Sequence, residues 1–197
     1  MPGIGLILLA AGGSARLGVP KQLAHAQGVT LLRRAAETAT ASKCDKVVVV
    51  LGAHRDACAT ELVGLPVVSV WNPDWGAGMG TSLRAGMEAL LADEMPDAVI
   101  LMLCDQLLLT PAVLDAMVDC FQTGGNQLIA SEYAGVLGVP ALFSSELFPE
   151  LLALNGEEGA RSVIKRHRSH ALAIPFPEGA IDIDTPADLA NLEKQSL

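Results

Sequence analysis

The chain has 197 residues, of which 51% are hydrophobic and only 4% are aromatic, and its formal net charge is −9. This length favours a single domain over residues 1–197, and the aliphatic composition favours helices packed on a sheet over an aromatic-rich β-sandwich. The acidic balance argues against nucleic acid as a partner, because a nucleic-acid-binding protein presents a basic face. No apolar run approaches the roughly 20 residues that span a bilayer, so we expect no membrane segment.

The N-terminus carries no basic segment, and its apolar stretch belongs to the first predicted strand. We therefore expect no signal peptide and a cytoplasmic protein. The four cysteines form no zinc-binding CxxC pattern. Cys44, Cys58, Cys104 and Cys120 are expected to be free, buried thiols.

Strand-like and helix-like segments alternate along the chain. Strands are predicted at Ile4–Ala10, Lys46–Gly52, Val67–Val70, Ala98–Leu103, Asn126–Ala130 and Ala171–Ile174, the first four as near-continuous apolar runs. Helices are predicted at Thr30–Thr40, Arg55–Leu62, Gly80–Ala92, Pro111–Phe121, Ser145–Leu152, Gly159–Arg166 and Pro186–Lys194. Such alternation predicts an α/β fold with a mostly parallel sheet and right-handed crossovers. The pattern is less regular from about Ser131, where we expect an antiparallel excursion.

Two of the predicted helices have clear start signals. Thr110-Pro111 and Thr185-Pro186 each place a hydroxyl at the N-cap and proline at the first helical position. Asp188 stands where a capping-box acid belongs.

The first predicted strand runs directly into a glycine-rich loop with two positive charges. Gly12 and Gly13 allow positive φ angles and a close approach of backbone N–H groups to a ligand, and Arg16 and Lys21 follow. Amides and cations together suit a polyphosphate. The Walker pattern is absent, since Lys21 follows Pro20 and no hydroxyl comes next, and the glycine spacing does not match the dinucleotide fingerprint. The alternative is an ordinary strand turn with surface charges.

Acidic residues at two further places in the chain are candidate metal ligands. Ligands of open α/β sheets bind beyond the carboxyl ends of the strands, and Asp105 stands there after a buried run, well placed to bind Mg²⁺. Its alternative role as a helix cap is disfavoured, because the next helix starts only after Thr110. Asp182 and Asp184 share one face of an extended segment and are candidates to complete a metal site with Asp105. The alternative is that Asp184 interacts with the dipole of the following helix.

The segment Gly76–Ser82 has three glycines and two hydroxyls before a predicted helix. Such a backbone can lie against a flat nucleobase and hydrogen-bond its edge, or it can form a surface turn. A basic cluster, Lys165–His170, is either a contact for an anionic acceptor or a solvated helix face.

The glycine-rich loop resembles the L-A-A-G-x-S-x-R-x-G-x-x-K signature of the nucleotidyltransferase superfamily. It matches through Leu9, Ala10, Ala11, Gly12, Ser14, Arg16, Gly18 and Lys21. Further matching blocks are Asn72-Pro73-Asp74-Trp75, Gly78-Met79, Ser82-Leu83, Cys104-Asp105-Gln106, Gly138-Val139-Pro140, the block 156–161 and the block 182–189. Together they resemble the molybdenum cofactor cytidylyltransferases, a group similar to the molybdopterin-guanine dinucleotide synthases.

This resemblance implies a three-layer α/β/α sandwich with a mostly parallel, Rossmann-like sheet of the nucleotidyltransferase type. It implies transfer of CMP from CTP to the terminal phosphate of molybdenum-molybdopterin, with Mg²⁺ on Asp105 and Asp184 as the cofactor. Arg16, Lys21 and Asp105 are the expected catalytic residues. The expected nucleotide-binding residues are Leu9, Ala10, Ala11, Gly12, Gly13, Ser14, Arg16, Lys21, Gly78, Ser82 and Asp105.

Three positions bear on the choice of substrates. Leu107 and Glu157 replace a proline and an aspartate that the family usually has, which affects the shape of the pterin side. Ala11 favours CTP, since guanylyl relatives tend to have glycine there. The alternatives are a guanylyl or sugar-phosphate nucleotidyltransferase, and a non-catalytic molybdenum cofactor carrier. A molybdoenzyme or its insertion chaperone is a candidate protein partner.

Overall fold

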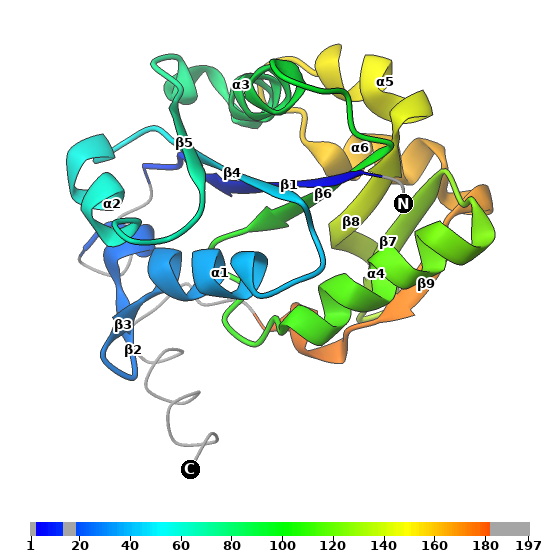
Figure 1. Cartoon of the computed structure of the whole chain (residues 1–197), viewed down its shortest axis with the longest axis horizontal. Coiled ribbons are helices and arrows are strands. Elements are labelled where there is room, and N and C mark those ends of the chain that lie inside the picture. The colour runs from blue at the N-terminus through cyan, green and yellow to red at the C-terminus, as the bar shows by residue number, and fades with distance from the viewer. Residues whose placement is uncertain (1–2, 14–18, 182–197) are drawn as a thin grey trace.

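A seven-stranded sheet with the order β5-β4-β1-β6-β8-β7-β9 forms the centre of the computed structural model, which describes residues 3–13 and 19–181 (Figure 1). Its strands are β1 (Ile4–Ala10), β4 (Lys46–Leu51), β5 (Val68–Trp71), β6 (Ala98–Leu103), β7 (Leu128–Tyr133), β8 (Val136–Ser144) and β9 (Leu172–Pro175). A separate two-stranded hairpin joins β2 (His25–Ala26) to β3 (Val29–Thr30).

The sheet is mostly parallel, as predicted. β1 pairs in parallel with β4 on one side and β6 on the other, and β4 continues to β5. β8 runs antiparallel between β6 and β7, and β9 pairs in parallel with β7. All seven residues of β1 are buried, which agrees with a strand covered on both faces.

Helices cover both faces of the sheet (Figure 1). The helices are α1 (Leu31–Thr40), α2 (Arg55–Glu61), α3 (Met79–Leu91), α4 (Pro111–Gly124), α5 (Phe148–Leu152) and α6 (Ala160–Arg166). Side chains of α1, α2 and α4 share one apolar core with the sheet, and those of α3, α5 and α6 share a second core on its other face. The predicted three-layer α/β/α sandwich is confirmed.

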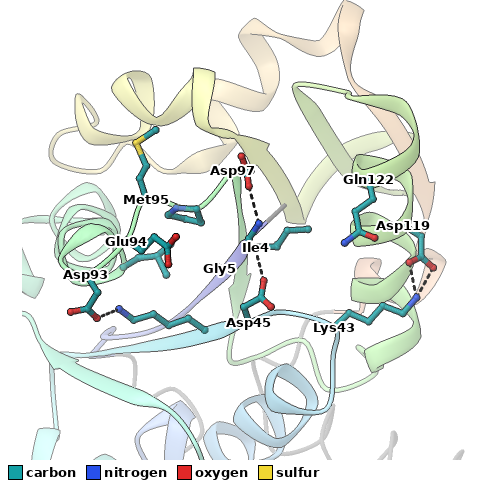
Figure 2. A pocket seen from close by; sticks show the side chains of 14 residues that line it. Ile4, Gly5, Lys43, Asp45, Asp93, Glu94, Met95, Asp97, Asp119 and Gln122 are labelled. Atoms are coloured by element: carbon teal, nitrogen blue, oxygen red, sulfur yellow. Dashed lines mark hydrogen bonds and ion pairs between the residues drawn. The ribbon is translucent and has the colours of Figure 1, made fainter. Parts of the chain in front are cut away.

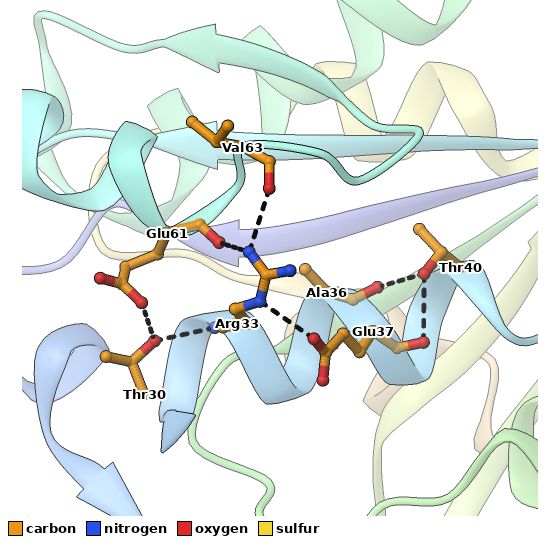
Figure 3. A network of polar contacts seen from close by, with 7 residues as sticks. All are labelled: Thr30, Arg33, Ala36, Glu37, Thr40, Glu61 and Val63. Atoms are coloured by element: carbon orange, nitrogen blue, oxygen red, sulfur yellow. Dashed lines mark hydrogen bonds and ion pairs between the residues drawn. The ribbon is translucent and has the colours of Figure 1, made fainter. Parts of the chain in front are cut away.

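Arg33 joins α1 to the end of α2 (Figure 3). Its Nη1 donates to the carbonyl oxygen of Glu61, the last residue of α2, at 3.0 Å and to that of Val63, just beyond the helix, at 3.1 Å. Thr30 accepts the backbone N–H of Arg33 as the N-cap of α1, and its hydroxyl donates to Oε2 of Glu61 at 2.7 Å. These contacts satisfy groups that helix ends leave unpaired.

The structure differs from the sequence-based predictions in three places. β8 was not predicted, although an antiparallel excursion was expected in this region; Gly138 and Pro140 interrupt its apolar pattern, and such residues are disfavoured inside strands. Thr110 is the N-cap residue of α4, but its side chain makes no capping hydrogen bond; its carbonyl oxygen accepts from Val113 instead. The short β2–β3 hairpin lacked any apolar run that would predict it.

Several predictions fall outside the described residues, namely the helix 186–194 with its start at 185–186 and Asp188. The four cysteines are free thiols; Cys58 and Cys104 are buried, whereas Cys44 and Cys120 are half-buried. Within residues 3–13 and 19–181, none of the helices is long and apolar enough to cross a membrane.

Candidate functional site

A cleft of about 530 Å³ opens at the carboxyl ends of β1 and β6. We call it the central cleft; it is lined by Leu9, Ala10, Ala11, Gly12, Gly13, Lys21, Gln22, Trp75, Gly76, Gly78, Met79, Ser82, Leu103, Cys104, Asp105 and Glu157. It brings together each expected nucleotide-binding residue that the structure describes. Ser14, Arg16, Asp182 and Asp184 lie outside the described residues, so their predicted roles stay predictions.

Gln22 holds one wall of the central cleft. Its side chain is 3% exposed, and Nε2 donates to the carbonyl oxygens of Ala10, at 3.0 Å, and Gly12. The amide thus fixes the end of β1 and the start of the glycine-rich loop. Its Oε1 is buried and has no hydrogen-bond partner among the described residues. Gln22 was not predicted as a site residue, because an uncharged side chain beside Lys21 carries no signal of its own in the sequence.

The opposite wall is built around Asn72, which follows β5 and is 3% exposed. Its Nδ2 donates to the hydroxyl oxygens of Thr81 and Ser82, both at 2.9 Å, and its Oδ1 accepts from the backbone N–H of Asp74 at 2.9 Å. One side chain therefore fixes the turn before α3. Ser82 is buried against this amide, so its hydroxyl is oriented by the protein.

Gly78 has a φ of 115°, a conformation that side chains with a Cβ rarely adopt. A Cβ there would lie 2.1 Å from the carbonyl oxygen of Gly156, and the N–H of Gly80 donates to the same oxygen at 3.0 Å. The wall is therefore packed directly against the loop before α6. This contact brings Glu157, an exposed carboxylate, to the mouth of the cleft.

Lys21 and Asp105 meet in the cleft, with Nζ of Lys21 3.0 Å from Oδ2 of Asp105. Lys21 belongs to a short 3-10 turn after the glycine-rich loop, and Asp105 follows β6. Their side chains are 16% and 32% exposed, respectively, so the pair is partly withdrawn from water but open to a ligand. A cation and an oxygen ligand side by side suit a metal-bound polyphosphate.

The donor set of the cleft fits Mg²⁺. Mg²⁺ binds oxygen ligands, and at nucleotide sites it takes one or two carboxylates together with substrate phosphates. Asp105 and Glu157 are the carboxylates that line the cleft. The described residues contain no group of three or more metal-ligating side chains, so a metal here would depend on substrate oxygens or on acids beyond Ile181.

Cys104 lies beside Asp105 but is a poor ligand. Burial raises the pKa of its thiol far above the ordinary range, and the Asp105 carboxylate raises it further, although Lys21 partly offsets the effect. The thiol therefore stays protonated and neutral at physiological pH.

Residues 6–171 match the family model of the MobA-like NTP transferase domain. The chain belongs to the MobA-like NTP transferase family. Its resemblance to this group is thereby confirmed, and so is its class as a nucleotidyltransferase.

Two curated relatives are 30% identical to this MobA-like chain. One is a nicotine blue oxidoreductase of Paenarthrobacter nicotinovorans, aligned over 84% of this chain and 83% of the relative. The other is the purine catabolism protein PucB of Bacillus subtilis, aligned over 92% of each chain. Among solved structures, Rv0371c of Mycobacterium tuberculosis superposes with a TM-score of 0.77 at 31% identity over 98% of each chain. A manganese complex of Rv0371c superposes with a TM-score of 0.75 at 29% identity over 98% of each chain.

Two further hollows flank the central cleft of this MobA-like domain. The β8 hollow, of about 270 Å³, shares Leu103 and Asp105 with the cleft and includes Gln106, Tyr133 and Arg161. The tryptophan hollow, of about 670 Å³, shares Gly13 and Trp75 with the cleft and includes Arg55 and Trp71. The spaces follow the strand order of the sheet: the tryptophan hollow lies by β5 and β4, the central cleft by β1 and β6, and the β8 hollow by β8 and β7.

Gln106 fixes the wall of the β8 hollow. Its Nε2 donates to the carbonyl oxygen of Val139 at 2.7 Å, next to Pro140, whose peptide bond is cis. The basic cluster predicted as a candidate acceptor contact lies elsewhere. Lys165–His170 forms the end of α6 and the turn after it, and lines neither hollow nor the cleft. Arg166 and His167 pair with Glu150, at 3.2 and 2.7 Å.

A larger cavity of about 840 Å³ lies at the amino ends of the parallel strands, away from the central cleft (Figure 2). Four of the five acidic residues that line it have partners: Asp45, Asp93, Asp97 and Asp119. Asp45 and Asp97 accept the backbone N–H groups of Ile4 and Gly3, both at 2.8 Å, and Asp93 pairs with a lysine at 2.8 Å. The contacts of Asp45 and Asp97 anchor the start of β1, and the pair of Asp93 with Lys46 anchors the start of β4, so these acids have a structural role.

Proposed function

We propose that this chain transfers CMP from CTP to the terminal phosphate of molybdopterin carrying molybdenum, and releases pyrophosphate in the cytoplasm. The observation that carries the proposal is the meeting of Lys21 and Asp105, 3.0 Å apart, beneath a glycine-rich loop at the carboxyl edge of the sheet. Membership of the MobA-like NTP transferase family supports it. The sequence blocks that resemble the molybdenum cofactor cytidylyltransferases support the choice of acceptor.

The reaction needs positioning and charge neutralisation more than proton transfer. An ionised oxygen of the acceptor phosphate attacks the α-phosphorus of CTP, a new P–O–P bridge forms, and the bond between the α- and β-phosphates breaks. Pyrophosphate leaves with the bonding electrons, so no strong general base is required. Catalysis then follows the logic of phosphoryl transfer, in which fixed cations stabilise the charge that develops on the leaving group.

Within this proposal Lys21 and Arg16 bind the phosphates. The N–H groups at Gly12, Gly13 and Ser14 donate to phosphate oxygens, and Gln22 holds the loop that presents them. Asp105 and Asp184 would hold Mg²⁺, which would polarise the α-phosphate when bound. Lys21 exchanges its contact with Asp105 for the phosphates as the nucleotide enters.

The β8 hollow is the proposed acceptor side, because Asp105 lines both it and the central cleft. Arg161 supplies a cation there for an anionic acceptor, and Gln106 and Tyr133 supply polar groups. The nucleobase lies between Ala11 and the segment that carries Gly78 and Ser82. The Ala11 side chain, 5% exposed, narrows this space and favours the smaller base.

A pyrophosphate-release assay tests the proposal. Purified protein is mixed with Mg²⁺, molybdenum cofactor and either CTP or GTP; we expect release with CTP. Release with GTP alone would make it a guanylyltransferase. A second set of reactions replaces the molybdenum cofactor with a sugar phosphate, and release only in that set would overturn the acceptor. Tight cofactor binding without release would indicate a carrier. One relative is named an oxidoreductase, so a parallel reaction with a reduced nicotinamide cofactor is used to monitor hydride transfer. We expect no hydride transfer.

A further inference from the structure

Both tryptophans of the chain are exposed, and both line the same hollow. Trp71 is 49% exposed at the end of β5, and Trp75 is 38% exposed in the turn before α3. Tryptophan side chains are usually well buried, so two exposed indoles in one hollow are unusual. The two differ in one respect: Trp75 also lines the central cleft, whereas Trp71 lines the tryptophan hollow alone.

Trp75 stands between the two spaces. A Cβ added at Gly13 would lie 2.8 Å from two atoms of its indole ring, so the ring packs against the backbone of the glycine-rich loop. A Cβ added at Gly52 would lie 2.6 Å from the Cβ of Trp75 and 2.8 Å from the Cβ of Ala11. The indole therefore continues the wall that Ala11 begins, with Gly52 giving both of them room.

The position of the indole is set by its backbone. Trp75 begins a 3-10 turn that is closed by hydrogen bonds from the N–H of Ala77 to the oxygen of Asp74 at 2.9 Å and from the N–H of Gly78 to the oxygen of Trp75 at 3.3 Å. The buried Asn72 amide accepts the N–H of Asp74. Trp71 has a different partner, since the Arg55 guanidinium lies 4.9 Å from the centre of its ring.

We propose that Trp75 is a specificity-determining residue that closes the nucleobase end of the central cleft and restricts it to a pyrimidine. This inference rests on the proposed function, which places the base between Ala11 and the Gly78–Ser82 segment. A single ring fits beside the indole, whereas the second ring of a purine needs the space that the indole fills. The tryptophan hollow, of about 670 Å³, shares Gly13 and Trp75 with the cleft, so we expect removal of the indole to join the two spaces.

Removal of the indole tests the proposal through substrate choice. Trp75→Ala is compared with the wild type by kcat/KM for CTP and for GTP with the same acceptor. We expect the GTP-to-CTP ratio to rise about 10- to 100-fold, the range for one steric element in a pocket. Trp71→Ala is the matched control, because it removes an indole from the same hollow and leaves the cleft wall in place; its ratio should equal that of the wild type.

An unchanged ratio in active Trp75→Ala would overturn the proposal, as would an equal rise in Trp71→Ala. If the wild type transfers neither nucleotide, the proposed function fails, and contact with the base is tested by fluorescence. Trp71→Phe leaves Trp75 as the single tryptophan of the chain. CTP added to this variant should quench its emission, whereas inorganic triphosphate at equal concentration should not. Binding of CTP without any change in emission would overturn the contact, whatever the enzyme activity.

Discussion

Nζ of Lys21 lies 3.0 Å from Oδ2 of Asp105, although 84 positions separate the two residues in the chain (105 − 21). The pairing of β1 with β6 produces this contact, because both residues follow strands that end at the same edge of the sheet. Before substrate binds, each charge has a partner, which lowers the cost of holding it in a partly buried cleft. In the proposed reaction the phosphates of the nucleotide would replace this contact at Lys21, and the Asp105 carboxylate would then be available to hold Mg²⁺.

Substitution of Asp105 should separate chemistry from folding. We expect Asp105→Asn, which keeps the shape but removes the charge, to reduce kcat by about 10²- to 10³-fold, the range for loss of one electrostatic group in an active site. Steady-state pyrophosphate release measures the effect. Asp93→Asn is the matched control, because Asp93 pairs with Lys46 at the opposite edge of the sheet and its side chain is 83% exposed. If Asp105→Asn keeps full turnover, Asp105 does not bind the metal.

The two hydrogen bonds of the Gln22 side chain should affect both the stability of the fold and the binding of the nucleotide. Gln22→Leu removes both hydrogen bonds to the Ala10 and Gly12 carbonyl oxygens and leaves these groups without that donor. We expect a loss of about 1–3 kcal/mol in the free energy of unfolding, the usual cost of a buried polar group left unpaired. The KM for the nucleotide should rise about tenfold, since the loop amides are no longer held in place.

Denaturant unfolding and steady-state kinetics measure these two effects of Gln22→Leu. Gln122→Leu makes the same chemical change at an exposed position beside the cavity at the amino ends of the strands. It should change neither quantity. A Gln22→Leu variant with unchanged KM and lower stability would reduce Gln22 to a structural role.

The carboxyl edge of the sheet was predictable from the sequence, whereas the walls of the cleft were not. Apolar runs ending at Ala10 and Leu103 locate the strands, and a ligand edge follows from parallel pairing alone. The contacts of Gln22 with the loop and of Trp75 with Gly13 depend on how loops return over the sheet. Loop contacts of this kind leave no repeating pattern of residues in the sequence, so they could not be predicted from it. β8 escaped prediction because its interior contains a proline.

Buried thiols should make the fold sensitive to alkaline pH. Burial raises the pKa of the Cys58 thiol from 9.0 to about 11. Between these values the unfolded chain releases the proton while the folded chain keeps it, so the free energy of unfolding falls as the pH rises. Burial acts in the same direction on Cys104. Urea unfolding at about pH 8 and about pH 10.5 measures the fall.

The Cys58→Ala variant isolates this effect. It should lose stability at both pH values because of the smaller side chain, but the difference between the two values should be smaller than in the wild type. Val49→Ala also truncates the buried core yet keeps all four thiols, so it should show the full difference. Equal pH dependence in all three proteins would contradict a role for Cys58.

Gly78 gives the sharpest test of the wall opposite the glycine-rich loop. Gly78→Ala places a Cβ 2.1 Å from the carbonyl oxygen of Gly156 at a φ of 115°, so the turn before α3 and the loop before α6 must move apart. Strained backbone of this kind costs of order 1–3 kcal/mol, and displacement of the wall should also raise the KM for the nucleotide several-fold. Gly64→Ala is the control, because Gly64 has a φ of 83° but is exposed away from the cleft, and a Cβ there has no neighbour within 4 Å among the described residues. Thermal unfolding and nucleotide titration compare the two variants. Backbone strain should lower the stability of both variants, but we expect only Gly78→Ala to lose affinity for the nucleotide. Equal affinity of the two would show that the contact with Gly156 does not shape the cleft.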